Sequence, residues 1–233
     1  MTNIKVIMNW EDECYLLSKK KFRENANIIN VFTFKKGKIS GIVYGGTSRK
    51  IRNYLQISNK LFVVNNLKNE NKIGYFKTEL IKAITPIYFN DKKRTSALVS
   101  ICTLLNILLP EAQPHKEIFK TFEKFIESLN LDNWIILYIL FEINLIRELG
   151  YDANLSSFDN VVSDNDETRK IKIDGYNYEV PKYLIKGLIP KNLNFFLIKK
   201  SLIFTRSLLL NKFFIPNNLI LPKSRIILEN YFN

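Results

Sequence analysis

The sequence has few of the residues that build disulfide or metal-based scaffolds. Its 233 residues include two cysteines, Cys14 and Cys102, and one histidine, His115. Two cysteines exclude both a framework of several disulfides and a four-cysteine zinc site, and one histidine excludes any site that needs two. Both cysteines stand among apolar neighbours, so we expect them to be buried and unreactive. Their scarcity favours a reducing, cytoplasmic compartment.

Long hydrophobic runs are also missing. The most apolar window, residues 134–141, is followed by Glu142 and then by Arg147, and it is shorter than the roughly 20 residues that a bilayer-spanning helix needs. The first 13 residues end in three acidic side chains and contain no long apolar region, unlike a secretory signal. A composition of 46% hydrophobic and 24% charged residues is typical of a folded globular protein.

Positive charge is abundant and unevenly distributed. The chain has 35 Lys and Arg against 22 Asp and Glu, a net charge of +13. Lysines outnumber arginines 27 to 8, which the base composition of an AT-rich genome can produce, so the total is weak evidence for a polyanionic partner. The distribution is more informative: the net charge is +9 in residues 1–80, zero in residues 81–150 and +4 in residues 151–233. This concentration favours nucleic-acid binding by the first third.

The first third also has the pattern of a small β-barrel. Strands are predicted over residues 13–19, 27–34, 39–44, 55–64 and 72–80, with a turn at Gly37 that needs a positive φ and an Asn- and Lys-rich turn over 65–71. Residues 45–48 are predicted to break the chain after the third strand. Five short strands in about 70 residues favour a closed barrel, because closure removes exposed sheet edges.

After residue 90 the pattern becomes helical. Helices are predicted over 91–109, 114–129, 131–149, 192–214 and 222–231, with Asp91 and Asp132 as N-caps and Gly150 as the residue that ends the third. The third helix is apolar nearly all round and is expected to be central. Residues 151–180 are polar and predict an irregular insertion of short strands or loop. The fold class is therefore α+β: a barrel over 1–82 and a helical bundle over 83–233.

Three basic segments fall at the ends of predicted strands or in loops, where a small barrel binds oligonucleotides. Each alone is an ordinary solvated surface, but together they favour phosphate binding. Their candidate DNA-binding residues are Lys19, Lys20, Lys21, Arg23, Lys35, Lys36, Lys38, Arg49, Lys50 and Arg52. Aromatic strand residues more often face a core, but Tyr44 and Tyr54 lie next to a basic loop and are candidates for base stacking.

Other motifs carry less weight. Residues 45–50 resemble a phosphate-binding loop but lack its Gly-Lys-Ser/Thr ending, so a turn is the better interpretation. The acidic run at 164–167 lacks the glycine of a calcium loop and is predicted to be a solvated loop. His115 follows Pro114 at a helix start and is expected to be structural. No constellation requires an enzyme, and no metal or cofactor is predicted.

Several motifs together resemble the RecO family of bacterial recombinational-repair proteins. They lie in residues 12–13, 16–25, 31–33, 37–41, 45–49, 55–56 and 74–80, and further on in residues 108–111, 114–115 and 147–151. The N-terminal motifs are together quite specific, and residues 191–214 match a late helix only in character. The resemblance covers most of the chain.

The resemblance implies an oligonucleotide/oligosaccharide-binding (OB) barrel followed by an α-helical domain. It implies binding of single- and double-stranded DNA, annealing of complementary strands, and a cytoplasmic, nucleoid-associated location. It also implies two partners: RecR, and the acidic, hydrophobic C-terminal tail of single-stranded-DNA-binding protein, which docks on the helical domain. Recombinase loading follows from these contacts. The helical match does not locate the tail pocket.

Two features depart from the family pattern. Members often have glycine before the glutamate of the first turn, where this chain has Arg23. Many members carry a four-cysteine zinc module in the insertion, whereas residues 151–180 contain no cysteine and Phe158 stands near the first expected position. The insertion is therefore predicted to be metal-free.

The leading hypothesis is a non-enzymatic DNA-binding mediator of recombination and repair. Three alternatives remain. One is an RNA-binding barrel protein, another is a protein-interaction scaffold whose charge reflects genome bias, and a more distant one is a metal-dependent nuclease that uses Asp164 and Asp166.

Overall fold

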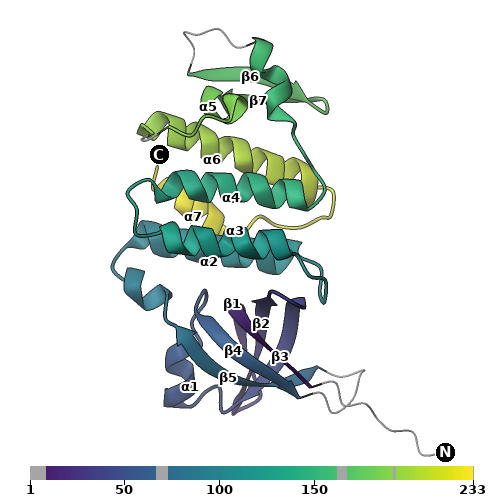
Figure 1. The fold of residues 1–233 in the computed structure, drawn as a ribbon, viewed down its shortest axis with the longest axis vertical. Coiled ribbons are helices and arrows are strands. Elements are labelled where there is room, and N and C mark those ends of the chain that lie inside the picture. Colours follow the sequence, from purple (N-terminus) through teal and green to yellow (C-terminus); the bar gives the residue numbers. More distant parts are fainter. Residues whose placement is uncertain (1–8, 67–72, 162–166, 191–192, 233) are drawn as a thin grey trace, which may run out of the picture. The chain divides into compact units, whose positions relative to one another are not determined.

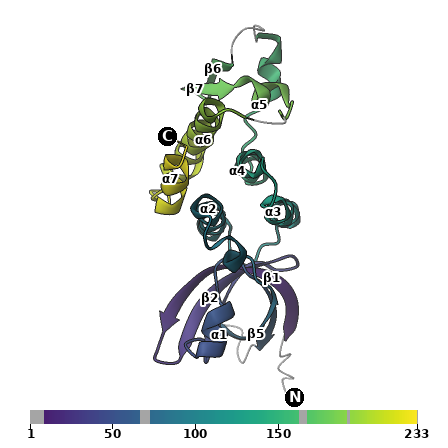
Figure 2. The ribbon, with the colours of Figure 1, turned by 90° about the vertical axis from the view of Figure 1, so that its left-hand side faces the viewer.

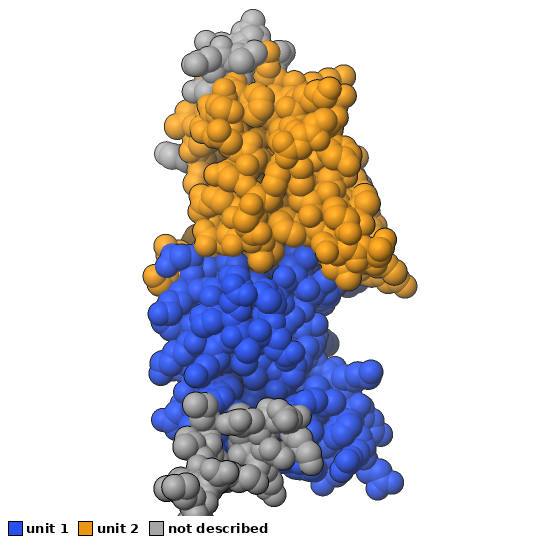
Figure 3. Space-filling model, turned by 90° about the vertical axis from the view of Figure 1, so that its right-hand side faces the viewer, with its two compact units in different colours: residues 1–119 blue, residues 120–233 orange. Residues whose placement is uncertain are grey.

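The computed structural model describes residues 9–66, 73–161, 167–190 and 193–232. The chain divides into two compact units, residues 1–119 and 120–233 (Figure 3). Each is described by itself. The predicted acidic residues Asp164 and Asp166 and most of the predicted turn at 65–71 lie outside the described residues.

Unit 1 contains a closed five-stranded barrel (Figure 1). Its strands are β1 (Trp10–Phe22), β2 (Ala26–Thr33), β3 (Gly37–Tyr44), β4 (Lys60–Asn66) and β5 (Gly74–Lys82). They follow one another around the barrel in the order β1-β2-β3-β5-β4, and only the β3–β5 pair is parallel. This is the OB arrangement, so the predicted barrel is confirmed.

The barrel interior is filled by one apolar cluster. Alternate residues of β1 and β4 point inward, as a strand period of two requires. The fully enclosed members are Cys14, Leu16, Ile29, Val31, Val43, Leu55, Leu61, Val63 and Phe76. The burial predicted for Cys14 is confirmed, and burial raises the pKa of its thiol well above the usual value.

The turn between β2 and β3 depends on Gly37. Its φ is +73°, as predicted, and a Cβ there would lie 1.8 Å from the backbone oxygen of Gln113. No other residue fits, because both the backbone conformation and the space exclude a side chain.

The segment between β3 and β4 forms a helix that the sequence analysis missed. Helix α1 (Arg49–Tyr54) begins after Ser48 and lies against the barrel (Figure 2). Its Ile51 and Tyr54 side chains pack against the barrel core. The predicted fourth strand therefore starts at Lys60 rather than at residue 55.

Unit 1 continues through a 3₁₀ turn, η1 (Thr85–Tyr88), into helix α2 (Lys92–Leu108), which packs against β1. The Asp91 carboxylate accepts a hydrogen bond from the backbone N–H of Arg94 at 3.0 Å, so the predicted N-cap is confirmed. Cys102 is fully buried in this helix.

Unit 2 is mainly helical. Helix α3 (Lys116–Ser128) leads into it, followed by α4 (Trp134–Glu148), α5 (Lys182–Lys186), α6 (Phe195–Leu209) with a π-helical turn η3 (Leu210–Phe214), and α7 (Lys223–Asn230). Gly150 ends α4 with φ +94°, as predicted. The N-cap predicted at Asp132 is wrong. Residues 131–133 form a turn, so α4 begins at Trp134, and Asn133 occupies the N-cap position without a side-chain hydrogen bond.

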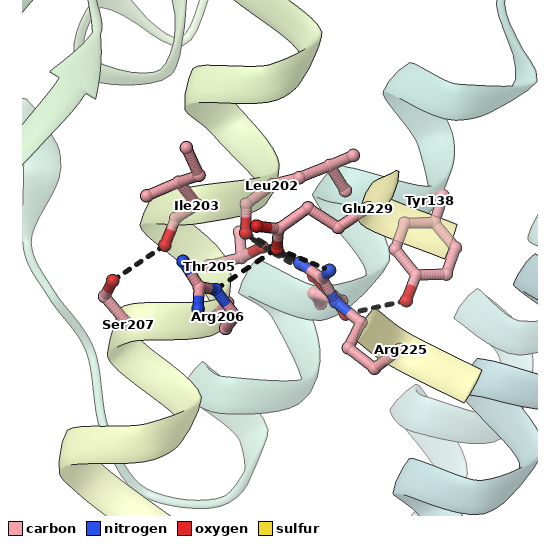
Figure 4. A network of polar contacts seen from close by, with 9 residues as sticks. Tyr138, Leu202, Ile203, Thr205, Arg206, Ser207, Arg225 and Glu229 are labelled. Carbon is pink, nitrogen blue, oxygen red and sulfur yellow. Dashed lines mark hydrogen bonds and ion pairs between the residues drawn. The ribbon is translucent and has the colours of Figure 1, made fainter. Parts of the chain in front are cut away.

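Helices α4, α6 and α7 share a fully buried polar network (Figure 4). The Arg225 Nε donates to Glu142 Oε1 at 2.5 Å, and its Nη2 donates to the backbone oxygen of Leu202 at 2.7 Å. Thr205 and Tyr138 donate their hydroxyls to the same carboxylate. Desolvation acts to lower the pKa of Arg225, but the charge of Glu142, its hydrogen bond and the interactions with Tyr138 and Glu229 together outweigh it and raise that pKa.

The insertion is more regular than predicted. A 3₁₀ segment, η2 (Leu155–Val161), precedes an antiparallel hairpin of β6 (Thr168–Ile173) and β7 (Tyr176–Pro181). Its turn, Asp174-Gly175, has positive φ at both residues, +47° and +86°. An Asp-Gly pair between alternating apolar residues is a strong hairpin signal, so the sequence held evidence for this element.

None of the helices in the described part of the chain combines the length and apolar character that crossing a membrane requires. The predicted domain boundary after residue 82 coincides with the end of β5, whereas the compact units divide after Phe119. The division falls later because unit 1 includes α2 and the start of α3, which pack against barrel strands.

Candidate nucleic-acid interface

Seven of the ten predicted DNA-binding residues lie at one end of the barrel. The last residues of β1 and the β1–β2 turn meet the turn that leads into α1, where Gly45 donates its N–H to Asn25 O at 2.8 Å and the Thr47 hydroxyl donates to Asn25 Oδ1 at 3.2 Å. We call this set the α1 end. It consists of Lys19, Lys20, Lys21, Arg23, Arg49, Lys50 and Arg52.

The charge of the α1 end is almost unopposed within its own segments. Residues 19–25 and 45–56 contain seven basic side chains and one acidic side chain, Glu24. All seven basic residues are exposed. Proteins that track a nucleic-acid backbone use cations gathered in this way, so these seven residues, from two segments that are distant in sequence, are the candidate phosphate-binding surface.

Lys19 joins β1 to α1. Its Nζ donates to the backbone oxygen of Leu55, the C-cap residue of α1, at 2.6 Å. A cation is favoured there by the helix dipole. Partial burial and, secondarily, the nearby charge of Arg52 lower the pKa of Lys19. Lys19 therefore positions the helix as well as adding charge.

The other three predicted residues lie at the opposite end of the barrel. Lys35 and Lys36 lie in the β2–β3 turn and Lys38 lies at the start of β3. This turn is level with Cys14 of β1, whereas the α1 end is level with Phe22. Eight residues of strand separate the two levels, roughly 25 Å. The structure thus does not bring all three basic segments together.

The charge at that opposite end is partly compensated. Lys38 donates from Nζ to the backbone oxygen of Asn106 at 2.8 Å, and desolvation lowers its pKa. Asp12 accepts from the N–H of Lys35 at 3.0 Å, and Glu111 bonds to Ser40 on β3. With Lys38 engaged and carboxylates close by, this end is a weaker phosphate-binding candidate.

The two predicted stacking tyrosines differ in exposure and contacts. Tyr44 ends β3 at the α1 end, is 51% exposed and stacks on Tyr75, with ring centroids 5.2 Å apart and planes 23° from parallel. Tyr54 instead packs its ring against the barrel core and donates its hydroxyl to Thr78 O at 2.7 Å. The stacking prediction is therefore narrowed to Tyr44, because the Tyr54 ring is used in packing.

Sequence reasoning missed α1 and Tyr75. Ser48 before Arg49-Lys50, with Ile51, Tyr54 and Leu55 at helical spacing, was a readable signal for one amphipathic turn. Tyr75 had no such signal, because its contact with Tyr44 depends on the parallel pairing of β3 with β5.

Metal-binding groups are not gathered anywhere in the described ranges: no cluster of three or more His, Cys, Asp or Glu is present there. His115 lies just before α3, and its backbone oxygen accepts a hydrogen bond from the N–H of Phe119 at 3.0 Å.

Comparison with known proteins agrees with this arrangement. The family model described as Recombination protein O N terminal matches residues 8–84, and the model described as Recombination protein O C terminal matches residues 90–167. Together they cover about two thirds of the chain. The chain belongs to the RecO family.

Curated RecO proteins align over the same region. The proteins named DNA repair protein RecO from Cereibacter sphaeroides and from Roseobacter denitrificans are each 32% identical over 150 and 151 residues, which is 64% of this chain and 63% of each relative. The Caulobacter vibrioides protein of that name is 29% identical over 157 residues, 67% of this chain and 63% of its own. The match thus spans less than two thirds of the relatives' length.

Arg23 stands in the β1–β2 turn where RecO proteins often have glycine, and its backbone conformation explains why glycine suits that position. Arg23 has φ +56°, in the left-handed region that favours glycine. Its guanidinium lies over the ring of Phe22, 5.1 Å from the centroid. The turn therefore keeps the conformation that suits glycine and gains a cation at the α1 end.

Proposed function

We propose that this chain is a non-enzymatic DNA-binding mediator of recombination and DNA repair. The observation that carries the proposal is the α1 end, where seven cations from two segments gather on an OB barrel. Membership of the RecO family, whose curated members are named DNA repair proteins, supports it.

The cations act on the DNA backbone rather than on base sequence. Phosphate charge is the same at every nucleotide, so binding through Lys and Arg is independent of sequence. Two strands held on one cationic surface repel each other less and pair more readily. The proposed action is therefore annealing, in which no covalent bond is made or broken.

The proposed partners follow from the family resemblance. RecR and the C-terminal tail of single-stranded-DNA-binding protein are the expected partners, and remodelling of single-stranded-DNA-binding protein on a strand precedes recombinase loading. The acidic tail is complementary to a chain of net charge +13, which supports docking on this protein without locating the site.

Charge-reversal variants distinguish the contributions of the two ends of the barrel to DNA binding. The triple variant R49E/K50E/R52E is expected to abolish binding of a single-stranded oligonucleotide at moderate salt, because it reverses the charge of α1. The variant K35E/K36E is expected to weaken binding far less. Fluorescence anisotropy at low and moderate salt measures both.

A matched control reverses three exposed lysines of unit 2: K170E/K172E/K223E. Equal loss in the control and the α1 variant would mean that net charge alone governs binding, and unchanged binding by R49E/K50E/R52E would reject the α1 end. Competition with an RNA oligonucleotide of matched sequence tests the RNA-binding alternative. A strong preference for RNA over DNA would support that alternative.

A further inference from the structure

The barrel closes along a very short seam. Strands β3 and β5 pair at only two positions, Gly41 with Gly74 and Ile42 with Tyr75. Beyond them β3 continues through Val43 and Tyr44 without pairing to β5, while the next residues of β5 pair with β4 on their other side. The two strands therefore separate toward the α1 end.

A hollow of about 370 Å³ lies where the strands separate. Its walls come from the end of β3, from α1, from the last residue of β4 and from β5. The lining residues are Val43, Tyr44, Ile51, Asn66, Tyr75, Phe76, Lys77 and Thr78. A volume of this size is within the range of sites that hold small organic groups.

The lining combines three chemical features. The stacked rings of Tyr44 and Tyr75 provide a flat aromatic surface, and Tyr44 is half exposed. Val43, Ile51 and Phe76 are apolar, whereas Asn66 and Thr78 offer hydrogen-bonding groups. Lys77 is exposed beside the hollow, and Ile51 is flanked by Lys50 and Arg52. A flat, partly polar ligand with an attached anion matches these features.

We propose that this hollow receives one unpaired nucleobase of a DNA strand, stacked against Tyr44, while the α1 end holds the neighbouring phosphates. The inference rests on the proposed function and adds selectivity to it. Bases within a duplex are already stacked and paired, so only a single strand can present a free base face. The hollow thus makes the barrel prefer single strands, which the cations alone do not.

The variant Y44A tests the proposal. Because stacking of one base contributes about 1–3 kcal/mol, Y44A is expected to weaken single-strand binding roughly 5- to 150-fold and to leave duplex binding unchanged. Its salt dependence should match that of the unaltered protein, since no phosphate contact is lost. Y44F keeps the ring and should bind normally.

Two further measurements sharpen the test. An oligonucleotide carrying 2-aminopurine should lose fluorescence on binding to the unaltered protein and not to Y44A. The control F89A removes another exposed ring of unit 1, which is 78% exposed and is not among the residues that line the hollow, and should change nothing. A free deoxynucleotide used as competitor distinguishes a strand-specific site from a general nucleotide site. Displacement of the oligonucleotide by a low concentration of the deoxynucleotide would favour the general nucleotide site.

The outcomes separate this inference from the proposed function. Equal loss of single-strand and duplex binding in Y44A, or no loss in either, would overturn the base-binding hollow while leaving the α1 end as the DNA-binding surface. Absence of DNA binding by the unaltered protein would reject both.

Discussion

Arg23 shows how one residue combines an unfavourable backbone conformation with a useful charge. An L-residue in the left-handed region costs about 1–2 kcal/mol, and Arg23 has φ +56° in the β1–β2 turn. Glycine there avoids that cost but loses more conformational entropy on folding, about 0.5–1 kcal/mol. The two terms leave a modest net advantage for glycine, at the expense of one cation at the α1 end.

The substitution R23G should therefore have opposite effects on stability and binding. The free energy of unfolding is expected to rise by up to about 1.5 kcal/mol, because the difference between the two terms is about 0–1.5 kcal/mol. Single-strand affinity should fall, with a shallower salt dependence, because one phosphate contact is lost. Urea unfolding and anisotropy measure the two effects, and R23K is the control that keeps the charge. A stability gain in R23K equal to that in R23G would reject the backbone explanation.

At the scale of elements, the buried network decides how α4, α6 and α7 pack. Arg225 and Glu142 are both fully buried and joined by two hydrogen bonds, 2.5 Å and 3.1 Å long. Removing Arg225 leaves the Glu142 carboxylate buried without a counter-ion, whereas removing Glu142 leaves Arg225 with Glu229, whose Oε2 lies 3.2 Å from Nη1. A buried pair adds little net stability compared with apolar residues, but breaking it is strongly destabilising.

A double-mutant cycle tests this role. R225M is expected to lower the free energy of unfolding by about 3–5 kcal/mol, because Glu142 stays buried without a counter-ion. E142M should cost less, because Arg225 keeps Glu229 as a partner. E142M/R225M should cost less than R225M, because Glu142 is gone and Glu229 keeps Arg206 at 3.2 Å. Urea denaturation monitored by circular dichroism gives the three values. Additive losses in the double variant would mean that the two residues act independently.

Elements with a local sequence signal were the predictable part of this fold. The five strands and the five longer helices follow from alternation, helical periodicity and caps such as Asp91. The Arg225–Glu142 pair was not predictable, because its members are 83 residues apart and Glu142 stands in an apolar run with no local partner. The short helix α1 and the Asp174-Gly175 hairpin left readable signals that were not used.

For the molecule as a whole, the position of the charge matters more than its total. The sequence predicted which third is basic, and the barrel brings two of the three basic segments together at the α1 end. It could not predict that the third segment lies at the opposite end, because that depends on strand register. The candidate site is therefore smaller than predicted and gains Tyr75, which no local pattern indicated.

Strand annealing is the prediction that belongs to this scale. The unaltered protein is expected to accelerate pairing of complementary oligonucleotides at low salt, with and without single-stranded-DNA-binding protein, and R49E/K50E/R52E should lose this acceleration. The rate is measured from the fall in fluorescence as pairing brings a fluorophore on one strand next to a quencher on the complementary strand. Binding without any acceleration would restrict the function to DNA binding and reject the mediator mechanism.

The buried arginine also has a consequence for synthesis of the chain. At 5–20 residues per second, Arg225 is made about 4–17 s after Glu142, from which 83 residues separate it. During that interval α4 carries a carboxylate on an otherwise apolar surface without its counter-ion. The core of unit 2 therefore cannot be completed on the ribosome until α7 has emerged, whereas every barrel strand of unit 1 is already available by then.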